Sequence, residues 1–371
     1  MRVSYLSLKE QFDDPVLLER ISALFSDAAF VLGPKVADFE RRFAALCRTA
    51  HAVGMNSGTD ALFLALKALG VGHGDEVITV SNSFVATAGA IVAAGAKPVF
   101  VDVGPDYNMD PDAIEPAVTS RTKAVLPVHL TGAMADMARI CEVAEAFSLS
   151  VVEDAAQAVG AAWNDQPAGS FGDVGCFSLH PLKNLNAAGD GGMAVTSRPE
   201  LADRLEKLRN HGLADRDHID FFGYNSRLDA LQAVVAERRL EFLPEITRCR
   251  RKNAAAYDEQ LAGLAPYVTR PVRQPESEPV YHTYVIRAKD RDGLAAYLAG
   301  AGVEAKIHYP VPIHLQKPAK DLGYRPGDLP ETEAQAAEIL SLPIHQHLSE
   351  NEIAYVCDTI RAFYRSRGPR P

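Results

Sequence analysis

The sequence predicts an α/β fold with two domains: a large domain with a mostly parallel, mixed sheet flanked by helices, and a smaller C-terminal α+β domain. Three observations predict it. Short apolar runs alternate with helical stretches over the first two thirds of the 371 residues. These runs are apolar throughout, as in strands that helices cover on both faces. The last third has its own strand and helix candidates after a long helical stretch, which indicates a second unit.

The elements of the large domain follow from the spacing of its apolar residues. After an apolar run that ends at Val53, residues 56–60 turn into a helix whose apolar positions from Leu62 to Leu69 recur every three or four residues. The glycines between 70 and 74 end this helix. Further strands are expected at Val77–Val80, Val99–Asp102, Ala124–His129, Val151–Asp154, Cys176–Leu179 and Gly192–Thr196, and helices near 84–94 and 134–147.

The smaller domain follows a long helical stretch from Arg227 to about Leu264, which is interrupted at Pro244. This organisation places the large domain at residues 1–245 and the small domain at residues 246–371. The elements expected in the later region are a strand at Thr283–Ala288, a helix near 291–300, a Pro- and His-rich stretch at 308–318 and a frayed tail at 365–371.

Composition and charge restrict the class of function. The formal net charge is −10, so a non-specific basic surface for nucleic acid is not expected. The chain has no run of about 20 apolar residues and no signal-peptide pattern, so neither a membrane span nor secretion is expected. Its five cysteines are scattered, odd in number and without CxxC spacing, which predicts a reducing, cytoplasmic location.

Asp154 is the first candidate for chemistry. It follows an apolar strand, and open α/β sheets bind their ligands at the carboxyl ends of their strands. By itself, the commoner role of such an aspartate is to cap a helix. An acidic partner of the ring nitrogen is, however, a recurring feature of pyridoxal-phosphate sites, because its charge keeps that nitrogen protonated.

Lys183 is the second candidate, in the Gly-rich segment between Gly175 and Gly192. An isolated lysine is ordinarily a solvated surface residue. Here it stands between a short apolar strand and a tight turn, where it could be held in place and buried. A buried amine loses its proton more readily, and only the neutral amine attacks an aldehyde. The segment is not a P-loop, because its lysine precedes the glycines.

Two further features are, by themselves, only weak evidence for a binding site. The segment Asn56–Asp60, with Ser57, Gly58 and Thr59, begins a helix, and the N–H groups and dipole of a helix start favour a phosphate. The same residue types also cap ordinary helices. Phe84 could stack on a cofactor ring, although core packing is the commoner role of such a ring.

Together these residues belong to an ordered series of motifs over nearly the whole chain. The series is FVLGPKVADFE (30–40), NSGTDAL (56–62), GDEVI (74–78), PVHLTG (127–132), EDAAQ (153–157), LKNL (182–185), GDGG (189–192), LRNHG (208–212), NSRLD (225–229), IHYP (307–310) and LPI (342–344). It closely resembles the DegT/DnrJ/EryC1/StrS family of sugar aminotransferases, which have the aspartate aminotransferase-like fold. The resemblance implies a transaminase that uses pyridoxal 5'-phosphate.

The resemblance also assigns roles to residues of this chain. Lys183 matches the lysine that holds the cofactor as a Schiff base and moves the proton, and Asp154 matches the partner of the pyridine nitrogen. The other implied cofactor contacts are a phosphate cradle of Ser57, Gly58, Thr59 and Ser178, the stacking ring of Phe84, Gln157 near the ring hydroxyl, and Asn225, which reaches the phosphate from the other subunit of a homodimer.

The chain departs from the family pattern at His180. The family usually has Phe-Tyr-Pro before the lysine, whereas this chain has Leu-His-Pro. Some relatives replace the lysine by histidine and act as sugar dehydratases, so a dehydratase is an alternative. Lys183 still stands directly before Asn-Leu, which favours the aminotransferase.

The expected substrates are glutamate, as amino donor, and a nucleotide-linked keto-deoxysugar such as a dTDP-3-keto sugar, for amino-sugar biosynthesis. His308, Tyr309 and His314 resemble a segment that lines the sugar pocket. The histidines 308, 314, 345 and 347 lack zinc-like spacing, so no metal site is expected. A cyclitol ketone as substrate and a catalytically silent regulator of the same fold stay open as alternatives.

Overall fold

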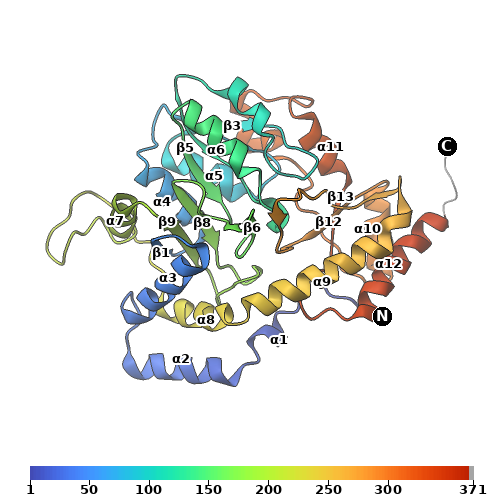
Figure 1. The fold of residues 1–371 in the computed structure, drawn as a ribbon, viewed down its shortest axis with the longest axis horizontal. Coiled ribbons are helices and arrows are strands. Elements are labelled where there is room, and N and C mark those ends of the chain that lie inside the picture. The colour runs from blue at the N-terminus through green and yellow to red at the C-terminus, as the bar shows by residue number, and fades with distance from the viewer. Residues whose placement is uncertain (367–371) are drawn as a thin grey trace.

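A seven-stranded sheet forms the centre of the large domain (Figure 1). The computed structural model describes residues 1–366, so most of the tail expected at 365–371 lies outside it. The strand order is β1-β9-β8-β5-β4-β2-β3, with β9 antiparallel to both of its neighbours and the other pairs parallel. The strands are β1 (His51–Met55), β2 (Glu76–Val80), β3 (Lys97–Val101), β4 (Thr122–Leu126), β5 (Ser150–Asp154), β8 (Val174–Ser178) and β9 (Gly192–Thr196).

Helices cover both faces of this sheet, as the continuous apolar strands predict. Side chains alternate along a strand, so Val77 packs with the helices on one face, whereas Ile78 packs with those on the other. On the first face lie α4 (Gly58–Ala68), α5 (Val85–Ala94) and α7 (Pro199–Leu208); on the second lie α3 (Pro34–Cys47), α6 (Met137–Ala146) and α8 (Ala230–Leu240).

Prolines account for two of the boundaries that differ from the expectation. The strand expected at Ala124–His129 ends at Leu126, because Pro127 has no N–H to continue the ladder. The long helix expected from Arg227 is two helices, α8 and α9 (Leu243–Leu261), and Pro244 lies in the first turn of the second. Proline is well tolerated there, since the N–H groups of a first turn have no partner in the helix.

A second, antiparallel sheet in the order β10-β12-β13 carries the core of the small domain. Val3 belongs to this core and pairs with Val303, so the N-terminus lies beside the last helix (Figure 1). Helix α9 joins the two cores, and the domain boundary expected at 245 and 246, which falls inside it, stays a prediction. The elements are β10 (Val268–Thr269), β12 (Tyr284–Ala288), β13 (Ile339–Leu342), α10 (Arg291–Gly300) and α12 (Glu350–Arg365).

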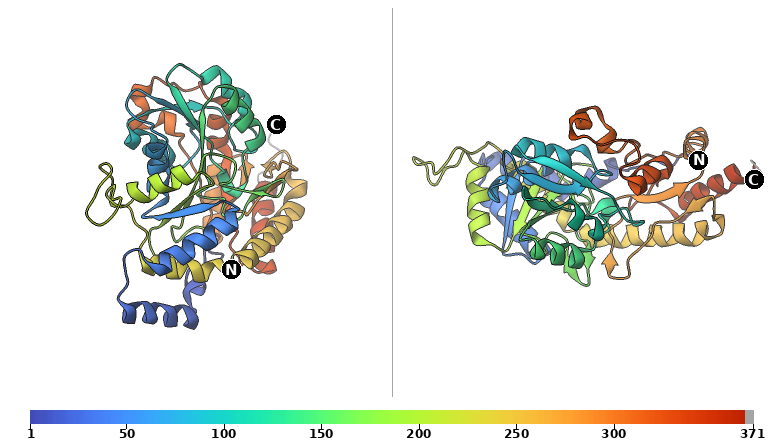
Figure 2. Two further views of the ribbon diagram at one scale, coloured as in Figure 1. Left: turned by 60° about the vertical axis from the view of Figure 1, so that its left-hand side comes forward. Right: turned by 90° about the horizontal axis from the view of Figure 1, so that it is seen from above.

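Three peripheral parts complete the chain. The short helix α1 (Lys9–Phe12) precedes α2 (Pro15–Asp27), which packs on α8. The loop between α7 and α8 projects away from the body in the views of Figures 1 and 2. A small sheet has the order β11-β6-β7, with β6 (Ala162–Trp163), β7 (Gln166–Pro167) and β11 (Ser277–Glu278). No helix within residues 1–366 is long and apolar enough to span a bilayer.

The segment 313–335, which we call the strap, returns from the small domain to the large sheet. It contains two short 3-10 helices, at Ile313–Leu315 and Lys317–Leu322, and the first part of α11 (Pro330–Glu338). Near the end of β3, the Tyr324 hydroxyl lies 2.7 Å from Phe100 N, and the Thr332 hydroxyl donates to Asp102 at 2.7 Å. The strap therefore fastens the two domains together at the edge of the sheet where strands β2 and β3 end.

Candidate active site

Three neighbouring strands meet the start of α4. Met55 of β1 pairs with Gly192 of β9, which pairs with Ser178 of β8. A Cβ atom at Gly58, the first residue of α4, would lie 2.8 Å from Ser178 Cβ, and one at Gly192 would lie 2.7 Å from Gly58 N. Both positions therefore need glycine for the backbones to approach. The positive end of α4 is thereby placed beside the Ser178 side chain, an arrangement suited to a phosphate.

The remaining residues of this corner lie around α4. Ser57 is the N-cap, and its hydroxyl accepts the N–H of Asp60 at 3.1 Å. Thr59 is exposed in the first turn. The Ser226 hydroxyl donates to Asp60 at 2.7 Å, while the neighbouring Asn225 is exposed. Asn225 thus stands at the surface, one residue from a direct contact with α4 of its own chain.

Asp154, at the end of β5, has a buried carboxylate that is 4% exposed. The Thr87 hydroxyl donates to Oδ2 at 2.7 Å, and Ala156 N donates to Oδ1 at 3.2 Å. Burial raises the pKa of Asp154, while these two hydrogen bonds and the charge of Lys183 act in the opposite direction. Thr87 must donate here, so its oxygen accepts from the Ser83 hydroxyl at 2.7 Å.

Lys183 lies in the turn that follows β8. Its backbone N–H donates to His180 O at 2.8 Å, and the next residue, Asn184, donates from its side chain to Val280 O at 3.0 Å. The side chain is half-buried. Burial lowers the pKa of Lys183 to about 8, against the opposing attraction of Asp154. His180 is exposed, and its Nδ1 accepts the N–H of Leu182 at 3.2 Å, so this imidazole folds back onto its own turn.

Two aromatic rings lie above this group. Phe84 precedes α5 and is 55% exposed, so its ring is not part of the core. Its centroid is 5.9 Å from that of Tyr309. Burial, followed by the charge of Asp154, raises the pKa of Tyr309 to about 12, and its hydroxyl interacts with Gln157. Gln157 is itself held by the N–H of Thr131, at 2.8 Å.

The two histidines expected in the sugar pocket differ in accessibility. His308 is half-buried, with Nδ1 2.9 Å from the Ser341 hydroxyl. Burial lowers its pKa to about 4, so it is neutral at pH 7. His314 is 2% exposed, and its ring nitrogens lie against Ser81 and Glu333. The structure thus brings His308 toward Lys183, whereas it buries His314, at the start of the strap, against Ser81 after β2.

Sequence reasoning missed several buried groups behind the site. Thr87 carried a usable signal, because it lies one helical turn after Phe84 in the same motif. Glu153 and His129 carried none: both are fully buried with 3.0 Å between Nε2 and Oε2. His282 is half-buried, and burial and the nearby charge of Lys183 lower its pKa well below the usual value.

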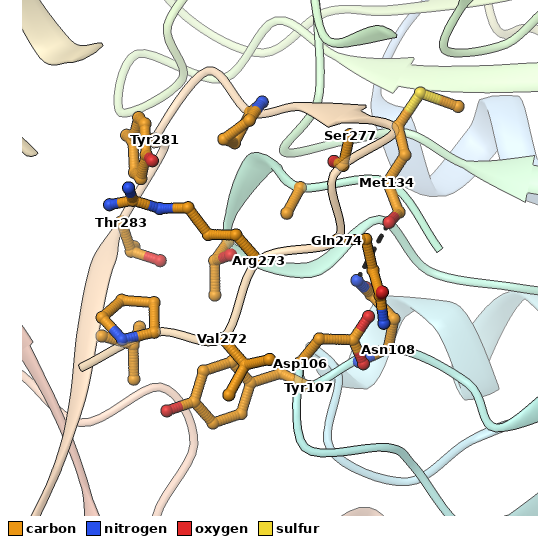
Figure 3. A pocket seen from close by; sticks show the side chains of 15 residues that line it. Asp106, Tyr107, Asn108, Met134, Val272, Arg273, Gln274, Ser277, Tyr281 and Thr283 are labelled. Atoms are coloured by element: carbon orange, nitrogen blue, oxygen red, sulfur yellow. Dashed lines mark hydrogen bonds between the residues drawn. The ribbon is translucent and has the colours of Figure 1, made fainter. Parts of the chain in front are cut away.

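A small cavity lies beside this site, between the two domains. Its labelled side chains in Figure 3 include Tyr107, Asn108 and Val272, and Arg273 lies over the Tyr281 ring at 5.2 Å. The cavity volume is about 20 Å³, room for roughly one water molecule. It cannot receive a cofactor or a sugar nucleotide. Within residues 1–366, no group of three or more His, Cys, Asp or Glu side chains could hold a metal ion.

A sequence model described as the DegT/DnrJ/EryC1/StrS aminotransferase family matches residues 13–361. The chain belongs to this family. It is 43% identical to each of three curated relatives. They are the pleiotropic regulatory protein of Geobacillus stearothermophilus (98% of this chain and 99% of the relative), the dTDP-3-amino-3,4,6-trideoxy-alpha-D-glucose transaminase of Streptomyces venezuelae (97% and 96%) and the UDP-N-acetyl-3-dehydro-alpha-D-glucosamine 3-aminotransferase of Acidithiobacillus ferrooxidans (97% and 96%).

Among solved structures, DesV of S. venezuelae superposes with a TM-score of 0.95 at 43% identity, over 98% of each chain. This confirms the predicted fold class. Similar solved structures hold the cofactor in its pyridoxal and pyridoxamine phosphate forms. The chain is a sugar aminotransferase that depends on pyridoxal 5'-phosphate, as its motifs predict.

The residues present fit this cofactor. Gly58 lets the start of α4 approach Ser178 so closely that a Cβ would lie 2.8 Å from Ser178 Cβ, which brings the first N–H groups of the helix and the serine side chain together, as a phosphate requires. Asp154 is a buried carboxylate that faces a lysine of lowered pKa. An aromatic ring of the stacking type, Phe84, stands exposed at the start of α5. A helix start beside a serine, a buried acid, an amine and an exposed ring thus come from separate elements to one edge of the sheet.

Proposed function

We propose that this enzyme transfers the amino group of glutamate to the C3 carbonyl of a nucleotide-linked keto-deoxysugar, with a dTDP-linked sugar as the first choice. The names of two relatives support the position on the sugar, since one refers to a 3-amino and the other to a 3-dehydro sugar. One of these sugars is linked to dTDP and the other to UDP, so both nucleotides belong in the test.

The observation that carries the proposal is the convergence of Gly58, Ser178, Asp154 and Lys183 at one sheet edge. When bound, pyridoxal phosphate supplies an aldehyde for the amino group and a ring that withdraws electrons. Asp154 stabilises the protonated ring nitrogen by opposite charge. The start of α4, with Ser57, Gly58, Thr59 and Ser178, binds the phosphate, and Phe84 stacks on the ring.

Lys183 would hold the cofactor and, in each half-reaction, would move a proton between the substrate carbon that bears the nitrogen and the aldehyde carbon of the cofactor. With a pKa of about 8, roughly one amine in ten is neutral at pH 7, many more than for a lysine in water. Tyr309 orients Gln157 toward the ring hydroxyl, and His308, neutral at pH 7, accepts a hydrogen bond from a sugar hydroxyl. The retention of Lys183 opposes a dehydratase, and the complete site opposes a silent regulator, despite one relative named as a regulatory protein.

A homodimer is part of the proposal, with Asn225 binding the phosphate in the partner's site. Its exposed position, one residue from the Ser226–Asp60 hydrogen bond, supports a place at an interface. Mixing Asn225→Ala and Lys183→Ala subunits tests it. If Asn225 acts across the interface, each heterodimer has one intact site and the mixture regains activity. If it acts within its own chain, every site carries a defect and the mixture stays inactive.

Borohydride reduction tests the cofactor link. Reduction of the holoenzyme, followed by peptide mass spectrometry, is expected to place the cofactor on Lys183. The His180→Ala variant serves as control and is expected to be labelled equally. Cofactor that stays dialysable after reduction, or that labels another residue, contradicts the proposed role of Lys183.

A substrate screen tests the reaction. The enzyme is incubated with glutamate or glutamine and with dTDP- and UDP-linked 3-keto and 4-keto sugars, and products are examined for gained nitrogen. Amination of a 3-keto sugar with glutamate is expected. Amination of a cyclitol ketone alone, or loss of water from the sugar without gain of nitrogen, would establish one of the alternative activities instead.

A further inference from the structure

The strap crosses the end of β2 at His314. Ile313 N donates to Ser81 O at 2.9 Å, and His314 N donates to Ser81 Oγ at 2.9 Å. The ring nitrogen Nδ1 of His314 lies 2.7 Å from the same hydroxyl. Ser81 is fully buried and His314 is 2% exposed. Three hydrogen bonds therefore join two consecutive strap residues to one residue of the large domain.

Glu333 determines where the protons of this contact lie. Its Oε1 is 3.2 Å from Nε2 of His314, and an ionised carboxylate only accepts, so Nε2 carries the proton. In the neutral ring Nδ1 is then the acceptor, and the Ser81 hydroxyl donates to it. Glu333 also accepts the N–H of Gly327 at 2.8 Å. The result is a series of hydrogen bonds that runs from Ser81 through His314 and Glu333 to the turn that precedes α11.

The hydrogen bonds between Ser81 and His314 lie close in sequence to both aromatic rings of the site. Phe84 follows Ser81 by three residues, and Tyr309 precedes His314 by five. The centroids of the two rings are 5.9 Å apart, with 41° between the ring planes. Asn82, which follows Ser81, donates from its side chain to Tyr107 O at 2.8 Å, so a second hydrogen bond holds the segment between Ser81 and Phe84.

Two other roles for His314 conflict with this geometry. A sugar ligand needs a ring nitrogen free to meet a hydroxyl, but both nitrogens are engaged and the side chain is buried. A hydrolytic Ser-His-Glu triad needs a serine that a substrate can reach, but Ser81 is 0% exposed.

We infer that His314 is a positioning residue: through Ser81 it fixes Phe84 and Tyr309 relative to each other, at the place where the cofactor ring is expected, and it does not bind the sugar. The inference rests on the proposed site. By this inference the strap has a function in the reaction, because a segment that returns from the small domain positions the ring of Phe84, which belongs to the large domain.

Three single substitutions test the link. Ser81→Ala removes the hydroxyl, and His314→Gln keeps a group that reaches Glu333 but loses the partner of Ser81. His314→Asn, the matched control, keeps a polar atom near the position of Nδ1. The readout is the visible circular dichroism of bound cofactor and its dissociation constant, neither of which needs turnover. Ser81→Ala removes two hydrogen bonds to His314 and His314→Gln removes one; both are expected to change the dichroism and to weaken cofactor binding by at least about tenfold, the usual effect of one lost buried hydrogen bond.

The double variant Ser81→Ala/His314→Gln is expected to lose no more than Ser81→Ala alone, because that single change already removes the bond to the His314 ring. His314→Asn is expected to stay within about twofold of wild type. The glutamate half-reaction, which involves no sugar, is expected to slow in the first two variants.

Several results overturn the inference. The first is that the variants keep wild-type dichroism and cofactor affinity and only their KM for the sugar nucleotide rises. The second is that Ser81→Ala has no effect while His314→Gln is damaged or unfolded. The third is that the effects of the two changes multiply in the double variant. Failure of the proposed function looks different. In that case the wild-type enzyme aminates no keto-sugar, while the dichroism of the variants still reports on the link.

Discussion

Thr87→Val isolates the hydrogen bond that holds Asp154. Valine has the shape of threonine, so the change removes the 2.7 Å donor to Oδ2 together with the acceptor of the Ser83 hydroxyl. A hydrogen bond to a charged group contributes about 1.5–3 kcal/mol, and one pKa unit corresponds to about 1.4 kcal/mol. The loss therefore raises the pKa of Asp154 by roughly 1–2 units, in the same direction as the effect of its burial.

The sign of the pH effect follows from the charge of Asp154. Its ionised form stabilises the protonated ring nitrogen, so activity falls as pH drops through the pKa of the carboxyl. The acid limb of kcat/KM for the glutamate half-reaction is expected to move to higher pH by roughly 1–2 units in the variant. Cofactor affinity at pH 7 is expected to fall with it.

Thr79→Val is the matched control. Thr79 is buried and donates its hydroxyl at 2.8 Å to an uncharged acceptor, Leu126 O. Thr87→Val is expected to lose about 1.5–3 kcal/mol in free energy of unfolding and Thr79→Val about 1 kcal/mol, but only Thr87→Val shifts the pH profile. An acid limb that stays in place in Thr87→Val, with the enzyme folded, would refute the role assigned to this hydroxyl.

Three further predictions follow from the geometry. Gly58→Ala places a Cβ 2.8 Å from Ser178 Cβ; overpacking of this kind costs about 1–3 kcal/mol, so equilibrium titration should show cofactor binding weakened roughly 5- to 150-fold. Gly89→Ala, with nothing within 4 Å of the new atom, should bind normally. Capture of added cofactor by apoenzyme should accelerate about tenfold per pH unit up to about pH 8 and then level off, since only neutral Lys183 reacts; stopped-flow absorbance measures it, and a rate that does not change between pH 6 and 8 contradicts the lowered pKa. His180→Ala should retain transaminase activity within about threefold, because that imidazole is bound to its own turn; a loss approaching that of Lys183→Ala would revive the dehydratase alternative.

The parts of the fold that the sequence predicts well depend on local pattern. Strands β2 and β5 are apolar runs between helices, and the helix expected near 291–300 is α10 with the same bounds. The misplaced end of β4 and the split between α8 and α9 each depend on one proline, whose effect is set by its position within an element. The two smaller sheets consist largely of two-residue strands, too short for any periodicity to appear.

In the candidate site, too, some residues can be predicted from the sequence and others cannot, for a physical reason. Lys183, Asp154 and Gly58 stand in motifs, and the order of these motifs along the chain predicts a place in the site for each of them. The groups that hold them in place do not. Ser81 and His314 are 233 positions apart, and Thr87 and Asp154 are 67 apart. No spacing rule connects such pairs, because folding alone decides which buried donor meets which acceptor. His314 shows the consequence: its motif resembles a sugar-pocket segment, yet burial leaves neither ring nitrogen free. A residue that looks like a ligand in sequence can thus be a support for ligands, and only the count of its occupied hydrogen-bonding atoms separates the two roles.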